Sequence, residues 1–115
     1  MTLRKIPMLI GGKEVMSAST DWRDVLNPAT QEVVAQVPFC TLDEVDAAIE
    51  NANEAFKTWR NTSLAARMRI MLKFQQLVRD NAKELAALIT LEHGKTLPDA
   101  EGEVGRGLEV IEHAC

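Results

Sequence analysis

Residues 41–59 read TLDEVDAAIENANEAFKTW and mark the point where the sequence changes from short strands to helices. Thr41, with Glu44 three residues later, has the capping-box pattern that starts a helix. Apolar residues then recur at intervals of three and four, which predicts a helix with one apolar face. They are Val45, Ala48, Ile49, Ala52, Ala55, Phe56 and Trp59. We expect helices over 41–115, and short strands and turns over 6–38, where this period is absent.

The segment before this helix contains the signals of two short hairpins. Gly11-Gly12 lies between two brief strand-like runs, and glycine adopts the positive φ that a tight hairpin turn needs. Asn27-Pro28-Ala29-Thr30 predicts a second turn, followed by a β-branched run over 33–37 that Pro38 ends. Because hairpins this short form no robust sheet alone, we expect them to pair with strands that this chain does not contain.

The segment after Trp59 predicts two or three further helices. Ser63 is a suitable N-cap, and a kink or break is expected at Asp80-Asn81. Gly94 fits the left-handed position that follows a helix. The last helix begins near Leu97, with Pro98 in its first turn, and its period runs to the final residue without a stop signal. We therefore interpret the sequence as a chain cut inside or at the edge of a helix.

Composition excludes several classes of protein. The chain has 115 residues, 46% hydrophobic and 26% charged, which is typical of a globular protein. A net charge of −4 without a basic run argues against nucleic acid as a partner. No apolar run approaches the roughly 18–20 residues that span a bilayer, and the first seven residues make no signal peptide. The expected compartment is the cytoplasm, or the mitochondrial matrix if a transit peptide has been removed.

The sequence motifs of this chain that could indicate catalysis are weak. Gly94-Lys95-Thr96 lacks the earlier glycine of a phosphate loop, because position 89 is Ile, and it follows a helix rather than a strand. Cys40 and Cys115 are interpreted as free thiols of a reducing compartment, without the neighbouring base that a nucleophile needs. His93 and His113 are too far apart for a helical ligand pair, so no metal site is predicted.

The last predicted helix holds the most informative residue, Arg106. On an ideal helix it lies nearly opposite the apolar face, and on this evidence alone a surface ion pair with Glu103 or Glu109 is favoured. Glycines in a helix each cost about 1 kcal/mol relative to alanine, which close packing or the approach of a ligand can offset, with packing favoured. Three such glycines surround this arginine: Gly102, Gly105 and Gly107.

Several motifs together resemble the aldehyde dehydrogenase superfamily. They are IGGKEV at 10–15, NPAT at 27–30 with the strand ending at Pro38, and LEHGKT at 91–96. A narrower similarity is to the CoA-acylating methylmalonate-semialdehyde dehydrogenase branch. It rests on DAEGEVGRGLE at 99–109 with HAC at 113–115, FKTW at 56–59 and FQQL at 74–77. The resemblance covers the chain from Ile6 onward.

This resemblance implies an α/β fold in the full enzyme, with a Rossmann-type cofactor domain, a catalytic domain and an oligomerisation arm. Residues 1–115 would be the amino-terminal part of the NAD-binding domain side, mainly helical with short hairpins. The family oxidises malonate or methylmalonate semialdehyde with NAD and CoA, releases CO2 and forms acetyl-CoA or propionyl-CoA, usually as a homotetramer. Neither Cys40 nor Cys115 matches the family's nucleophile, so no catalytic or cofactor-binding residue is expected here, and the chain alone should be inactive.

The same resemblance assigns Arg106 to the carboxylate of the substrate and reverses the preference for a surface ion pair. A charge-assisted bond of this kind contributes about 1.5–3 kcal/mol, and the glycines would then provide clearance for substrate or a nearby loop. Two alternatives stay open: another aldehyde dehydrogenase, such as a succinate-semialdehyde type, and a stand-alone helical interaction module without catalysis. Exposed strand edges and helix faces should favour association of the isolated chain.

Overall fold

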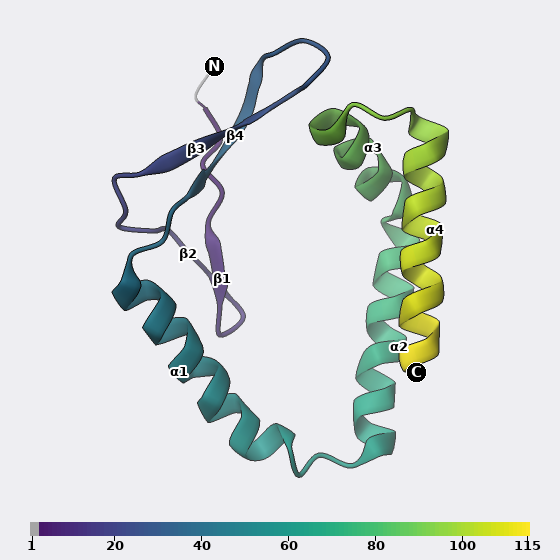
Figure 1. Cartoon of the computed structure of the whole chain (residues 1–115). Helices are drawn as coiled ribbons and strands as arrows, with labels where there is room; N and C mark the ends of the chain where they lie inside the picture. Colours follow the sequence, from purple (N-terminus) through teal and green to yellow (C-terminus); the bar gives the residue numbers. More distant parts are fainter. Residues whose placement is uncertain (1–2) are drawn as a thin grey trace. The chain divides into compact units, whose positions relative to one another are not determined.

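The computed structural model describes residues 3–115, and within them four short strands precede four helices (Figure 1). This order confirms the predicted change from strands to helices after Cys40. The chain divides into two compact units, one ending at Asn61 and the other beginning at Thr62. The first unit holds all four strands and one helix, and the second holds three helices.

The first hairpin pairs β1 (Met8–Ile10) with β2 (Lys13–Val15) in antiparallel register. Its turn is the predicted one, with φ of 59° at Gly11 and 74° at Gly12. A Cβ atom at Gly11 would lie only 3.1 Å from Asn51 Nδ2, on helix α1 (Leu42–Trp59). The turn therefore approaches the side of α1, and glycine is needed there for both conformation and space.

The second hairpin pairs β3 (Trp22–Leu26) with β4 (Val33–Pro38), with a register shift between Val25 and Leu26. The other edge of β4 is partly covered by residues near the start of the chain. Ile6 N–H donates to the Gln36 carbonyl, and Gln36 N–H donates to the Arg4 carbonyl, both at 2.8 Å. Part of the strand edge that we expected to need an outside partner is thus paired within this unit.

Helix α1 begins with the predicted capping box. The Glu44 amide donates to Thr41 Oγ1 at 3.3 Å, and the Thr41 amide donates to the Glu44 carboxylate at 2.9 Å. The same carboxylate accepts from Ser17 Oγ and from the Ala18 amide, each at 2.7 Å. These hydrogen bonds, led by the one from Ala18, lower the pKa of Glu44. One carboxylate therefore starts the helix and attaches the polar loop before β3.

Helix α1 buries none of its own residues. The first half of its apolar face and the first hairpin form an open groove of about 410 Å³. The rest of the face, including Phe56 and Trp59, is exposed. The groove is lined by Met8, Ile10, Cys40, Glu44, Val45, Ala48, Ile49 and Ala52.

The second unit contains α2 (Leu64–Asp80), α3 (Ala82–His93) and α4 (Leu97–Ala114). Ser63 caps α2 as predicted, by accepting from the Ala66 amide. The predicted break lies at Asn81, which leaves helical geometry with φ of −104° and ψ of 12°. Its side-chain amide donates to the Leu77 carbonyl at 2.8 Å, so the break is stabilised by the residue that makes it.

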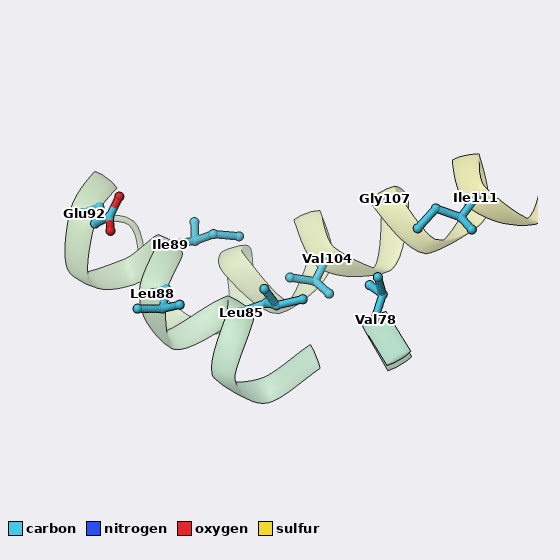
Figure 2. Close-up of a pocket in the computed structure, with 8 residues that line it drawn as sticks. All are labelled: Val78, Leu85, Leu88, Ile89, Glu92, Val104, Gly107 and Ile111. Carbon is cyan, nitrogen blue, oxygen red and sulfur yellow. The ribbon is translucent and has the colours of Figure 1, made fainter. Parts of the chain in front are cut away.

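The core of the second unit is built from small side chains. Ala86 and Ala100 are fully buried, Val104 is 8% exposed, and Val78, Ala82 and Ile89 pack against them. Figure 2 shows Val78 of α2, Leu85 of α3 and Val104 of α4 converging where the three helices meet. Because alanines let helices approach closely, α4 packs along both α2 and α3 (Figure 1).

A polar clamp joins α2 to the far end of α4. Gln75 Nε2 donates to Glu112 Oε1 at 2.8 Å, and Arg79 Nη2 lies 3.1 Å from the same oxygen. Within residues 3–115, none of the helices is both long and apolar enough to cross a membrane.

Candidate carboxylate-binding site on helix α4

The site is positioned by the short connection between α3 and α4. Gly94 ends α3 in the left-handed conformation, with φ of 82°, as predicted. Thr96 starts α4 by accepting a hydrogen bond from the Asp99 amide, and Pro98 lies in the first turn. Lys95 is the one residue between these two caps. Its backbone is therefore held on both sides, by Gly94 and Thr96, beside the start of α4.

Arg106 lies on the exposed side of α4, as the helical period predicted. Its side chain is 68% exposed, whereas Val104 is in the core and both Leu108 and Ile111 are half-buried. Its guanidinium Nη2 lies 3.8 Å from Glu103 Oε1. Of the two acidic residues considered in the sequence, Glu103 is therefore the one that pairs with Arg106. At this distance the pair is longer than a charge-assisted hydrogen bond, which is about 2.7–2.9 Å.

A second cation contacts the same oxygen atom. Lys95 Nζ lies 2.5 Å from Glu103 Oε1, and the Lys95 side chain is only 18% exposed. The pKa of Glu103 is lowered, first by the hydrogen bond from Lys95 and then by the charges of Lys95, Arg106 and His93. Sequence reasoning missed Lys95 as part of this site, because it regarded the residue only as a possible member of a phosphate loop.

The glycines around Arg106 are not explained by packing within this chain. A Cβ at Gly105 or Gly107 would meet nothing within 4 Å among the described residues. A Cβ at Gly102 would lie 3.6 Å from Arg106 Nη1, which is an ordinary contact. Within residues 3–115, no other backbone packs against Gly105 or Gly107. The space beside Arg106 is open on this helix.

Of the remaining candidate residues, His93 influences the site through its charge, which helps to lower the pKa of Glu103. Cys40 is exposed in the first unit, and its thiol donates to Met8 Sδ at 3.2 Å. Cys115 is exposed, and its thiol donates to the Ile111 carbonyl at 3.3 Å. His93 and His113 occupy the last turns of α3 and α4. In the part of the chain that the structure describes, no group of three metal-ligating side chains forms.

Neither residues 94–96 nor the two apolar grooves fit the phosphates of a dinucleotide or CoA. Residues 94–96 connect two helices rather than a strand and a helix, and the Thr96 hydroxyl is engaged by Asp99. Each of the two apolar grooves includes a glutamate and no cationic side chain, Glu44 in the first unit and Glu92 in the second. A phosphate placed beside either carboxylate would be repelled. No step involving NAD or CoA is therefore assigned to these residues.

Known proteins with similar sequences and structures share one activity class. The chain is 54% identical over 110 residues to human mitochondrial methylmalonate-semialdehyde/malonate-semialdehyde dehydrogenase [acylating], covering 96% of this chain and 21% of that protein. A methylmalonate-semialdehyde dehydrogenase from Oceanimonas doudoroffii superposes with a TM-score of 0.93 at 42% identity, over 98% of this chain and 23% of that chain.

A Sinorhizobium meliloti protein crystallised with NAD superposes with a TM-score of 0.92 at 39% identity, over 97% of this chain and 23% of that chain. The chain thus spans about a fifth of the length of the curated relative named above. Residues 15–115 match the aldehyde dehydrogenase family, and this match includes every helix and all strands except the first hairpin. The chain therefore belongs to the aldehyde dehydrogenase family.

Proposed function

We propose that this chain is the amino-terminal part, on the NAD-binding domain side, of an NAD-dependent, CoA-acylating malonate/methylmalonate-semialdehyde dehydrogenase. The 54% identity to an acylating relative supports this branch of the family. The observation that carries the proposal is Arg106, exposed on α4 with open space at Gly105 and Gly107 on either side. Arg106 is available for a carboxylate that arrives from outside these residues.

The role proposed for Arg106 is to bind the carboxylate of the semialdehyde. A guanidinium offers paired N–H donors that match a carboxylate, which orients the substrate as well as attracting it. The 3.8 Å pair with Glu103 leaves this guanidinium weakly engaged. The rest of the enzyme would supply the nucleophilic cysteine and the sites for NAD and CoA. When bound, NAD accepts hydride from the aldehyde carbon, and CoA accepts the acyl group.

The proposal is tested by replacing Arg106 with alanine in the complete enzyme. Loss of a charge-assisted bond of about 1.5–3 kcal/mol corresponds to a KM for malonate semialdehyde roughly 10- to 100-fold higher. The KM for propanal, which has no carboxylate, should change little. The matched control is Arg69→Ala, an exposed arginine on α2. Equal losses on the two aldehydes in Arg106→Ala would contradict the carboxylate role.

Dependence on CoA separates this function from the closest alternative. A CoA-acylating enzyme should form acetyl-CoA or propionyl-CoA, with NADH produced in step with the thioester. A succinate-semialdehyde type of enzyme should release the free acid and reduce NAD at the same rate without CoA. Mass spectrometry of the products of the complete enzyme distinguishes the two. The compartment we propose is the cytoplasm, or the mitochondrial matrix in a eukaryote, since the human relative is named as mitochondrial.

Exposed apolar surface supports homo-oligomers for the enzyme and association for the isolated chain. The chain exposes 8789 Å², whereas two separate compact bodies of half its mass would expose about 7,500 Å² in total. Large apolar residues such as Phe56, Trp59 and Phe74 are among those exposed. This surface would equally serve an interaction module without catalysis. NADH formation by the complete enzyme, and none by residues 1–115 alone, is the result expected for the enzyme.

A further inference from the structure

Two cations share one carboxylate oxygen at the start of helix α4. Lys95 Nζ lies 2.5 Å from Glu103 Oε1, and Arg106 Nη2 lies 3.8 Å from the same atom. Lys95 is fixed between the caps at Gly94 and Thr96 and is 18% exposed, whereas Arg106 is 68% exposed. Glu103 is therefore held by the less mobile of its two partners.

The charges of this cluster do not cancel. Lys95 and Arg106 contribute two positive charges and Glu103 one negative charge, so the cluster carries one positive charge in excess. The short contact lies at Lys95, and the long contact leaves the excess charge at the Arg106 guanidinium. If Lys95 lost its charge, Glu103 would be free to shorten its i, i+3 ion pair with Arg106, which is now 3.8 Å long. The excess charge would then disappear.

We propose that Lys95 is a positioning residue that keeps the ion pair between Glu103 and Arg106 long and weak, and so leaves the Arg106 guanidinium available to an anionic substrate. The inference rests on the proposed function, because it assumes that Arg106 binds a carboxylate. Lys95 itself does not touch the substrate. It keeps the Glu103 carboxylate from competing with the substrate for Arg106. How strongly Arg106 attracts a substrate anion therefore depends on how closely Glu103 can approach it.

The test is a pair of substitutions in the complete enzyme. Lys95→Met should raise the ratio of the KM for malonate semialdehyde to the KM for propanal about tenfold, which corresponds to about 1.4 kcal/mol. Adding Glu103→Gln to Lys95→Met should return the ratio close to its original value, because the competitor has then lost its charge. Lys83→Met, on exposed α3 surface, is the matched control and should leave the ratio unchanged.

Recovery of the KM ratio in the Lys95→Met, Glu103→Gln double variant separates a positioning role for Lys95 from a merely structural one. A purely structural Lys95 would lower kcat and raise both KM values together, and the second substitution would not restore them, which would overturn the inference. An unchanged KM ratio in Lys95→Met, together with a selective loss in Arg106→Ala, would overturn the inference alone. A non-selective loss in Arg106→Ala would overturn the proposed function, and the inference with it.

A measurement without substrate tests the contact on which the inference depends. NMR titration of the Glu103 carboxyl should show a higher pKa in Lys95→Met than in the unmodified protein, because the main cause of its lowering has been removed. The Arg106 side-chain N–H should exchange more slowly in the same variant, because its ion pair with Glu103 becomes shorter than 3.8 Å. Unchanged exchange at Arg106 would contradict the proposed competition between the two cations.

Discussion

Each of the two units of this chain is stabilised internally by a different kind of interaction. In the first unit, the carboxylate of Glu44 accepts hydrogen bonds from Ser17, Ala18 and Thr41, while Ala35 is the only residue buried among 3–61. In the second unit, Ala86 and Ala100 are completely buried where α3 meets α4. The first unit therefore depends on polar anchoring, and the second depends on close packing of small side chains.

This difference indicates which substitutions each unit tolerates. A packed alanine core is sensitive to added volume, because its neighbours have no space to move into. A hydrogen-bonded anchor is sensitive to loss of an acceptor and to pH, but not to volume. The first unit also exposes most of the apolar face of α1, so its helix gains little from packing within this chain. The two units should therefore respond separately to added volume and to acid.

The largest effect is expected from Ala100→Leu in the second unit. Ala100 is fully buried, and overpacking a core typically costs about 1–3 kcal/mol. Urea denaturation followed by circular dichroism should show a lower free energy of unfolding for α2–α4. Glu101→Leu introduces the same side chain at an exposed neighbouring position and is the control. Equal destabilisation by both variants would show that the alanine core does not hold the unit together.

A smaller effect, of about 1 kcal/mol, is expected from loss of a helix N-cap. Thr41→Ala removes the acceptor for the Glu44 amide in α1, and Ser63→Ala removes the acceptor for the Ala66 amide in α2. Because α2 is packed against α4 and joined to it through Glu112, Thr41→Ala should speed amide hydrogen exchange along more of α1 than Ser63→Ala does along α2. If amide exchange became faster over equally long stretches of α1 and α2, the contrast between the two units would be contradicted.

The smallest effect is expected on mild acidification, which protonates the Glu44 carboxylate that attaches the polar loop before β3. Folding lowers the pKa of Glu44, so its contribution to stability is present above the ordinary glutamate pKa of about 4.3. That contribution is lost as the pH falls through the lowered pKa. The Ala18 amide resonance should shift in this window, and the shift should be absent in Glu44→Gln. Glu50→Gln, on exposed α1 surface, is the control.

Short-range features of the fold were predictable from the sequence. Thr41 and Glu44 are three residues apart, and Gly94 and Pro98 flank a helix boundary, so local geometry determines these elements. The break at Asn81 and the Gly11-Gly12 turn are local in the same sense. Such predictions were confirmed because the interacting groups lie within one turn of helix or one hairpin.

Interactions between distant residues were not predictable in this way. Glu44 meets Ser17 across 27 residues of sequence, and no spacing rule links a capping residue to a polar loop. Lys95 and Glu103 meet because the connection between α3 and α4 turns sharply at Gly94. For Arg106, the helical period predicted its exposure and two possible partners, and the structure shows that Glu103 is the one that pairs with it. The open space beside Gly105 and Gly107 required the packing of the chain to be known.

The clamp at Glu112 has a consequence for the order in which the protein is made. Glu112 follows Gln75 by 37 residues, an interval of roughly 2–7 seconds at a synthesis rate of 5–20 residues per second. The two strands of each hairpin are synthesised within a much shorter interval, since they are neighbours in sequence. During synthesis, α2 therefore leaves the ribosome well before its partner helix exists. Its apolar side chains face the solvent of the cell for several seconds before α4 covers part of them.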